Sequence, residues 1–319
     1  MIADPEQLTV RTTEPAPAKL NLCLRVLGRN HLGLHELCSI AEPLALEDQV
    51  EVSLSPEGEK GVGGTPKVTC RCPDHPELEG ESNLAARAAE RLLAHLGAPR
   101  RCEVTLRKRI PVGAGLGGGS ADAAATLRGL FRLLVPRPPL QALEQVATSL
   151  GADLRFCLQS QAAVMRGTGD RLEPIELPGH FLCLVFAGEP LPTSLVFERH
   201  DSMKTGNASL QAPGVLGPKE EGPPSHPALP ILSLEKLGTL VGNDLLPSAL
   251  DLQPRIGEAL EAMGKMEPIA AGMTGSGSGV FGLFANQADA SKAARALVDE
   301  GWQSISTEPR QAAALWPPA

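Results

Sequence analysis

The sequence predicts a protein of mixed α and β structure that is divided into two domains. Segments with alternating apolar residues, which are typical of strands, are interspersed with segments whose apolar residues recur at helical spacing. The chain has 319 residues, more than one ordinary hydrophobic core needs. We therefore expect an α+β or α/β fold, with one domain at 1–170 and a second at 171–319.

The first half of the chain contains predicted strands and helices in turn. Alternating apolar residues predict strands at 19–26, 49–54 and 103–106. Helical spacing predicts helices at 82–96, 120–134 and 140–150. Ser82 stands where an N-cap is expected, and prolines 136, 138 and 139 should end the second helix. The glycine-rich stretch 58–65 is expected to be a loop.

The second half returns to the same alternation after Gly151. The predicted strands are 154–158, 162–165, 181–186 and 280–284. The predicted helices are 234–240, 254–263 and 288–300. Between 201 and 230 the chain is rich in Gly, Pro, Ser and charged residues and has no apolar period, so we expect a long insertion or lid there.

Charge and composition favour a small-molecule partner. The net charge of −8 argues against a nucleic-acid partner, which would need a basic face. No apolar run approaches 18 residues, and residues 1–15 lack the features of a signal peptide, so we expect no membrane partner and a cytoplasmic location. The sequence leaves open whether the protein is a monomer or a homodimer.

The cysteines favour reduced thiols rather than a disulfide framework or a metal site. There are seven cysteines, an odd number, and most are scattered along the chain. Cys70, Cys72 and His75 form a CxCxxH cluster, but no second pair of ligands follows at zinc-site spacing. We expect no metal held by protein side chains alone.

The most informative segment is PVGAGLGGGSA at 111–121, which contains five glycines within seven positions. Glycines allow the backbone to turn its N–H groups inward, and the loop leads directly into an Ala-rich helix whose first amides and dipole attract phosphate. Ser120 can add a hydroxyl to a phosphate oxygen or to Mg²⁺. The segment predicts a phosphate-binding loop.

Two other phosphate-binding motifs fit this segment poorly. Gly113, Gly115 and Gly118 match GxGxxG, but the preceding residues are charged, and no acidic residue follows at the spacing that a dinucleotide site requires. The P-loop of nucleotide hydrolases needs Lys before the Ser or Thr, and Gly119 stands there instead.

The segment PVGAGLGGGSADAA resembles the second motif of the GHMP small-molecule kinases. PAKLNL at 17–22 and GMTGSGSGVF at 272–281 resemble two further motifs, in the family's order. The resemblance also extends over GLHEL, LGADLRF, PLPTSLVF and GNDLLP, and covers most of the chain except 55–75 and 200–230. It implies an N-terminal domain with a βαβ unit like that of ribosomal protein S5, a ferredoxin-like C-terminal domain, and an active site between them.

The activity that this resemblance implies is phosphorylation of a small alcohol with ATP and Mg²⁺. The similarity is greatest to family members that phosphorylate the 2-hydroxyl of a cytidylyl-methylerythritol substrate in the non-mevalonate isoprenoid pathway. A GHMP kinase for another alcohol and a catalytically silent ligand-binding relative stay open as alternatives.

The resemblance also implies roles for individual residues. Asp153 matches the catalytic base and Lys19 the catalytic lysine, a pair that makes physical sense because a cation keeps the carboxylate ionised. The implied nucleotide-binding residues are Asn83, Lys108, Pro111, Val112, Gly113, Ala114, Gly115, Leu116, Gly117, Gly118, Gly119, Ser120 and Ala121. The implied substrate-binding residues are Asn21, His35, Phe197, Thr274, Gly275 and Ser276.

The sequence departs from the family pattern at three positions in or near these motifs. Leu34 stands where the family usually has an aromatic, so one side of an expected cytosine sandwich is missing. Arg155 replaces a Pro close to Asp153, and Thr274 replaces a Ser but keeps the hydroxyl.

Overall fold

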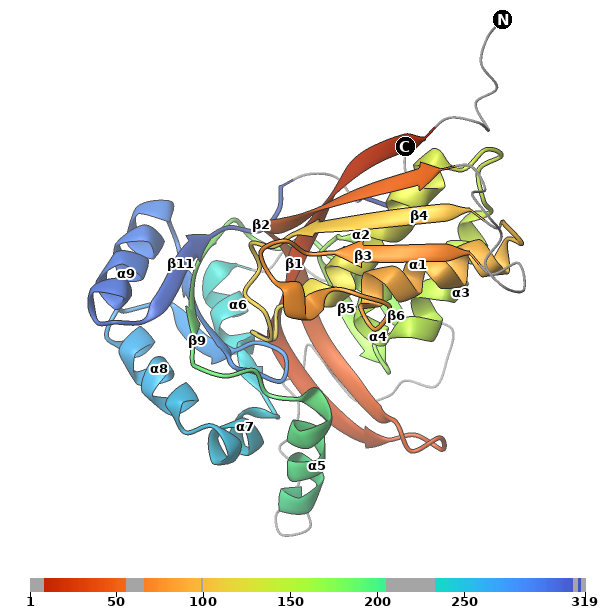
Figure 1. Ribbon diagram of the computed structural model, residues 1–319. Helices are drawn as coiled ribbons and strands as arrows, with labels where there is room; N and C mark the ends of the chain where they lie inside the picture. Colours follow the sequence, from red (N-terminus) through yellow and green to blue (C-terminus); the bar gives the residue numbers. More distant parts are fainter. Residues whose placement is uncertain (1–8, 56–65, 99, 205–232, 312–314, 317–319) are drawn as a thin grey trace, which may run out of the picture.

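The computed structural model describes residues 9–55, 66–98, 100–204, 233–311 and 315–316 (Figure 1). Two sheets with helices packed on them make up the molecule, and the predicted mixture of α and β structure is confirmed. The predicted loop at 58–65, and the predicted insertion from 205 onward, lie outside the described residues. Within the described residues, no helix has the length and apolar character needed to cross a bilayer.

The first sheet is built on a long antiparallel hairpin of β1 (Val10–Arg29) and β2 (His35–Ser55). Both strands extend well beyond the predicted segments. Residues 16–24 of β1 are all buried, so no alternation between buried and exposed residues marks the middle of the strand. The other strands of this sheet are β3 (Lys67–Arg71), β4 (Arg101–Arg107), β5 (Ala163–Gly167), β6 (Arg171–Pro174) and β8 (Gly242–Asn243).

Four helices form a layer beside this sheet, in which α2 is central and α3 packs on α1 and α4. They are α1 (Leu84–His95), α2 (Gly118–Leu133), α3 (Leu140–Leu150) and α4 (Ala152–Gln159), with a short 3₁₀ turn η2 at Pro76–Leu78. Helix α2 is buried continuously from Ala121 to Phe131. A Cβ at Gly129 would lie only 2.8 Å from Cγ2 of Val52, so glycine at this position allows the close approach of α2 to β2.

The second sheet has the strand order β11-β7-β10-β9, with all neighbours antiparallel. Its strands are β7 (Phe181–Phe186), β9 (Ala270–Met273), β10 (Gly279–Phe284) and β11 (Gln303–Thr307). Helices α8 (Arg255–Gly264) and α9 (Gln287–Asp299) pack against it on the left in Figure 1. The chain order is that of a ferredoxin-like βαββαβ unit.

Three further helices belong to the second half of the chain. They are α5 (Thr193–Lys204), α6 (Leu234–Leu240) and α7 (Leu246–Leu252). In Figure 1, α5 projects from the bottom of the molecule, and ion pairs join it to the β1–β2 hairpin. The division between domains at 170 and 171 remains a prediction; β6 and β8, which follow it in the sequence, pair in the first sheet.

Three local predictions were wrong, and one is the start of the insertion at 201, since 201–204 belong to helix α5. Residues 154–158 were expected to form a strand but lie in helix α4. A short apolar run fits either structure, and here Leu154, Phe156, Cys157 and Leu158 are all buried, so periodicity could not decide. The N-cap of α1 is Asn83 rather than Ser82, and its side chain accepts a hydrogen bond from the Ala85 N–H.

Candidate active site

Two cavities meet at the glycine-rich loop. The larger, of about 890 Å³, is lined by residues of both halves of the chain, including Lys19, Asp153 and Phe197. The smaller, of about 440 Å³, is lined by Asn83, Lys108 and the loop itself. Gly115, Gly117 and Ser120 line both cavities. A ligand in one cavity can therefore reach a ligand in the other across the loop.

The glycine-rich loop ends in the N-terminus of α2, which begins two residues earlier than predicted. Its position is held from both sheets, since the Lys19 N–H donates to the Leu116 carbonyl and the Gly279 N–H to the Ala114 carbonyl. Gly115 has φ +72°, and a Cβ there would lie 2.6 Å from the Thr274 carbonyl oxygen. Glycine is thus required at this position both for its backbone conformation and for the close contact.

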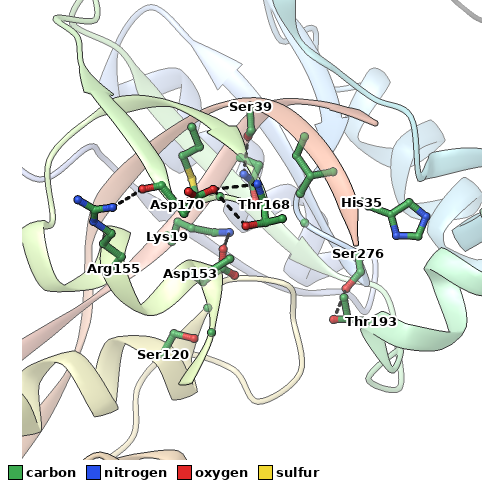
Figure 2. Close-up of a pocket in the computed structure, with 18 of the residues that line it drawn as sticks. Lys19, His35, Ser39, Ser120, Asp153, Arg155, Thr168, Asp170, Thr193 and Ser276 are labelled. Atoms are coloured by element: carbon green, nitrogen blue, oxygen red, sulfur yellow. Dashed lines mark hydrogen bonds and ion pairs between the residues drawn. The ribbon is translucent and has the colours of Figure 1, made fainter. Parts of the chain in front are cut away.

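Lys19 and Asp153 form an ion pair beside this loop (Figure 2). The Lys19 Nζ lies 2.7 Å from Oδ1 of Asp153. The lysine side chain is 5% exposed, whereas the carboxylate is 41% exposed and faces the larger cavity. Asp153 lies in the first turn of α4, where free backbone N–H groups favour a negative charge. A buried cation thus holds an accessible carboxylate in the cavity.

Asn21 lines the larger cavity, and Thr274 lies behind it in contact with its backbone. The Asn21 N–H donates to Oγ1 of Thr274 at 2.9 Å, and its Nδ2 donates to Oγ of Ser39 at 2.6 Å. The buried Asn21 Oδ1 has no hydrogen-bond partner among the residues that the structure describes. Thr274 is buried and does not line the cavity, whereas Gly275 and Ser276 do.

At another part of the larger cavity, His35 packs on Phe197 from helix α5. Their ring centroids are 4.5 Å apart and the rings are inclined by 31°. The His35 Nε2 lies 2.8 Å from Oδ1 of Asp201, which also pairs with Arg29. Burial opposes ionisation of Asp201, but the hydrogen bonds from His35 and Arg29 outweigh it and lower the pKa of this carboxyl.

Leu34 is 53% exposed and lines the same cavity. An aliphatic side chain therefore occupies the position where the sequence analysis noted a missing aromatic. His35, Phe197 and Leu34 thus all line the larger cavity, and the first two are in contact.

The smaller cavity contains the predicted nucleotide-binding residues other than Ala121, which is buried in α2. Lys108 Nζ pairs with Oδ2 of Asp48 at 2.5 Å and with Oδ2 of Asp122 at 2.6 Å. Burial raises the pKa of Asp122 to about 7, and the nearby charge of Lys108 limits this rise. The Asn83 side chain is likewise hydrogen-bonded: its Oδ1 accepts from the Ala85 N–H, and its Nδ2 donates to the Leu78 carbonyl. Both side chains thus also stabilise the wall that they line.

The structure also identifies site residues that sequence reasoning missed. Oγ1 of Thr193 lies 3.0 Å from Oγ of Ser276, and Ser39 contacts Asn21; both residues line the larger cavity. Arg155, two residues after Asp153 in α4, donates to the carbonyl of Asp170 (Figure 2). Single hydroxyl and charged residues of this kind follow no pattern in the sequence, and only the fold brings them together.

The thiols take no part in this site. All seven cysteines are free and buried, and burial raises the pKa of Cys157, behind Asp153 in α4, to about 12. Within the described ranges, no group of three or more His, Cys, Asp and Glu residues is arranged to hold a metal ion.

Comparison with protein families gives two matches along the chain. The family described as GHMP kinases N terminal domain matches residues 83–161, and the one described as GHMP kinases C terminal matches residues 226–303. The two matches include the glycine-rich loop, Asp153 and the turn at 272–281.

Curated relatives match over most of their own length. The 4-diphosphocytidyl-2-C-methyl-D-erythritol kinase of Anaeromyxobacter sp. (strain Fw109-5) is 39% identical over 285 residues, which are 89% of this chain and 86% of the relative. The enzyme of the same name from Parvibaculum lavamentivorans is 37% identical over 91% of this chain and 95% of the relative.

Solved structures agree with these matches. A crystal structure of 4-(cytidine 5'-diphospho)-2C-methyl-D-erythritol kinase superposes with a TM-score of 0.70 at 32% identity, and covers 94% of this chain and all of its own. Homoserine kinase from Cytophaga hutchinsonii has a TM-score of 0.67 at 18% identity over 96% of this chain and 95% of its own, a likeness of fold alone.

Proposed function

The chain belongs to the GHMP kinase family, and from this premise we propose that it transfers a phosphoryl group from ATP to the 2-hydroxyl of 4-diphosphocytidyl-2-C-methyl-D-erythritol. The reaction belongs to the non-mevalonate route to isoprenoid precursors. Relatives of this name match the chain almost end to end, and the expected GHMP kinase fold is present.

The observation that carries the proposal is the Lys19–Asp153 ion pair at the junction of the two cavities. Asp153 has the exposure to accept the proton of an acceptor hydroxyl bound in the larger cavity. The buried Lys19 keeps that carboxylate ionised and offsets the negative charge that develops as the oxygen attacks phosphorus. Neither residue needs to form a covalent bond with the phosphoryl group, since positioning and charge stabilisation suffice for this transfer.

In this proposal, ATP binds in the smaller cavity, with its phosphates at the glycine-rich loop. The loop N–H groups and the N-terminus of α2 bind the phosphate oxygens. Asn83 and Lys108 lie where they line the rest of that cavity and would contact the nucleoside.

A magnesium ion fits the residues at the junction of the two cavities. Ser120 places a hydroxyl there, and Mg²⁺ in kinase sites is held mainly by substrate phosphates and water with few protein ligands. Ser120 would hold the ion, which when bound neutralises charge on the phosphates.

The cytidylyl group of the acceptor would occupy the wall formed by His35 and Phe197. A base ring can stack on the Phe197 face, and the His35 ring can form hydrogen bonds with the base edge. Asn21, Gly275 and Ser276 would contact the part of the acceptor that connects the base to the reacting hydroxyl. Thr274 would hold Asn21 in place by accepting a hydrogen bond from its N–H.

The other predicted properties belong to the same proposal. We expect the enzyme to act in the cytoplasm on a small molecule, without a nucleic-acid or membrane partner. A monomer and a homodimer remain equally compatible with it.

ADP release from purified protein with Mg-ATP tests the function. We expect turnover with the cytidylyl substrate and little with the same alcohol without its cytidylyl group. Turnover only with the truncated alcohol or with a different alcohol would indicate a GHMP kinase of other specificity. No turnover with any candidate alcohol would indicate a catalytically silent relative.

A further inference from the structure

We propose that Arg128 is a positioning residue that holds Lys19 and Asp153 in register with the phosphate-binding loop. Arg128 lies in helix α2, the helix that begins at the loop, and it does not line either cavity. The inference rests on the proposed phosphoryl transfer, because it concerns the same catalytic pair.

The guanidinium of Arg128 is buried and donates to two different elements. Arg128 is 1% exposed. Its Nη1 donates to the carbonyl oxygens of Cys157 at 2.9 Å and Leu158 at 3.3 Å, both in α4. Its Nη2 donates to the carbonyl oxygen of Pro15, in β1, at 2.5 Å. The planar guanidinium presents donors from separate nitrogens at a fixed spacing, which suits carbonyl oxygens on two elements, whereas an ammonium presents all of its donors from one nitrogen.

The contacts to α4 complete the capping of its C-terminal end. A helix leaves its last four carbonyls without partners inside the helix. In α4, the Ser160 N–H donates to Phe156, Arg128 donates to the next two carbonyls, and the Leu315 N–H donates to Gln159. The cation also opposes the negative end of the helix dipole.

A helix fixed at one end determines where its other end lies. Helix α4 has only eight residues, about 12 Å at the usual rise per residue. Asp153 is the second of these residues, in the first turn. The cap at the C-terminal end therefore sets the distance of the Asp153 carboxylate from Lys19.

The contact to β1 holds the strand that carries Lys19. Pro15 lies four residues before Lys19 in the same strand, and the Lys19 N–H donates to Leu116 in the glycine-rich loop. Glu14, next to Pro15, pairs with Arg132 at 2.6 Å and lies 3.8 Å from Nε of Arg128. Arg128 thus connects the phosphate-loop helix with both elements of the catalytic pair.

Burying a cation has a desolvation cost that an apolar side chain does not have. Desolvation lowers the pKa of Arg128 to about 10, and an apolar side chain of similar volume often stabilises a core at least as well as a buried ion pair. The fork geometry, rather than charge balance or volume, accounts best for an arginine here.

The test compares Arg128→Met with the matched control Arg132→Met. Arg132 lies one turn further along α2 and also pairs with Glu14, but its side chain is 49% exposed, and in the described part of the chain no hydrogen bond links it to α4. We expect Arg128→Met to lower kcat at least about tenfold, because misplacement by about 1 Å can reduce the rate this much. KM for ATP should stay within about twofold, since the loop itself is unchanged. Arg132→Met removes the nearer cation of the buried Glu14 without touching α4, so kcat should change by less than about twofold.

Two more variants separate positioning from charge and from folding. Arg128→Lys keeps the charge but not the fork, so we expect kcat near that of Arg128→Met; wild-type kcat would overturn the proposal. The double variant Glu14→Gln/Arg128→Met also removes the buried carboxylate whose ionisation Arg128 and Arg132 both support, and it is used if the single variant fails to fold. If either folded methionine variant keeps the kcat of the Arg132→Met control, Arg128 serves stability alone and the proposal is wrong.

A readout without turnover keeps the inference separate from the proposed function. The carboxyl ¹³C resonance of Asp153, assigned through its loss in Asp153→Asn, reports the contact with Lys19 in the absence of substrate. It should shift in Arg128→Met and stay unchanged in Arg132→Met, even if no alcohol is turned over. An unchanged resonance in both variants would contradict the positioning role.

Discussion

Lys19 and Asp153 lie 134 positions apart in the sequence, yet their side chains are 2.7 Å apart at the edge of the phosphate-binding loop. Strand β1 brings the lysine, and the first turn of helix α4 brings the aspartate. The cation is buried and the carboxylate is open to the cavity, so the pair has the asymmetry that a lysine-assisted general base requires.

We expect Asp153→Asn to abolish phosphoryl transfer and leave ATP binding nearly unchanged. The amide has the same shape but cannot accept the proton of the acceptor hydroxyl, and general-base catalysis contributes about 10²- to 10⁴-fold. Asp153 lines the larger cavity but not the smaller one. Initial rates with the cytidylyl substrate and calorimetric titration with an ATP analogue measure the two effects. Near-normal turnover would show that another group is the base.

We expect Gly115→Ala to weaken ATP binding about tenfold or more. The new Cβ would lie 2.6 Å from the Thr274 carbonyl oxygen, at a φ of +72° that side chains rarely adopt. Left-handed backbone costs roughly 1–2 kcal/mol for a residue other than glycine, and the clash adds to it. The loop must therefore move. The control is Gly264→Ala at the end of α8, where a Cβ meets no atom within 4 Å. Equal ATP affinity in the two folded variants would contradict a phosphate-binding role for the loop.

We expect Phe197→Leu to raise KM for the cytidylyl substrate about tenfold and to leave KM for ATP unchanged. Stacking of a base on an aromatic ring is worth roughly 1–3 kcal/mol, and leucine keeps the apolar volume without the ring. The control is Leu195→Ala on the same helix, at a side chain that is 42% exposed and does not line the cavity. Steady-state kinetics with each substrate varied in turn measures both constants. A KM that changes equally in both variants would place the cytidylyl group elsewhere.

Much of the fold could be predicted because its periodic segments follow local rules. The predicted segments at 140–150, 181–186 and 234–240 coincide with α3, β7 and α6. Prediction failed where tertiary burial removes the period. The strand predicted at 19–26 lies within β1, but its extension over 10–18 was missed, and α4 is a short apolar run that fits a strand equally well. Very short elements, such as β8 and β9, leave too few residues for any period.

The candidate site likewise has a part that could be predicted from the sequence and a part that could not. The glycine-rich loop is visible in the sequence because its residues are contiguous, and Gly113, Gly115 and Gly117 have the positive φ that favours glycine. The other residues in and around the site are not contiguous in the sequence. Thr193 and Asp201 lie in a helix of weak amphipathic character that the sequence did not predict, and Arg128 looks like any other polar residue in an Ala-rich helix. Their contacts are determined by how α5 and α2 pack, which no local pattern encodes.

We also expect stability to fall as the pH rises above about 6.5 through loss of a proton from His180. His180 precedes β7 in the second sheet, and its Nε2 lies 3.0 Å from Oε1 of Glu42 in β2 of the first sheet. Its Nδ1 lies 2.7 Å from the Pro178 carbonyl oxygen, so both ring nitrogens face acceptors. Burial lowers the pKa of His180, but the hydrogen bond and charge of Glu42 outweigh it, and the net pKa is raised.

The sign of the pH effect follows from this raised pKa. Below the unfolded pKa, both states carry the proton and the full stabilisation is present. Between the unfolded and the folded pKa, only the folded state keeps the proton, so the free energy of unfolding falls by up to about 1.4 kcal/mol per pH unit. His180→Gln should remove this fall, whereas His95→Gln, at an exposed position at the end of α1, should keep it. Urea unfolding of the three proteins from pH 6 to pH 9 measures the slopes. If the slope in His180→Gln is as steep as in the wild type, a group other than His180 titrates and the prediction is wrong.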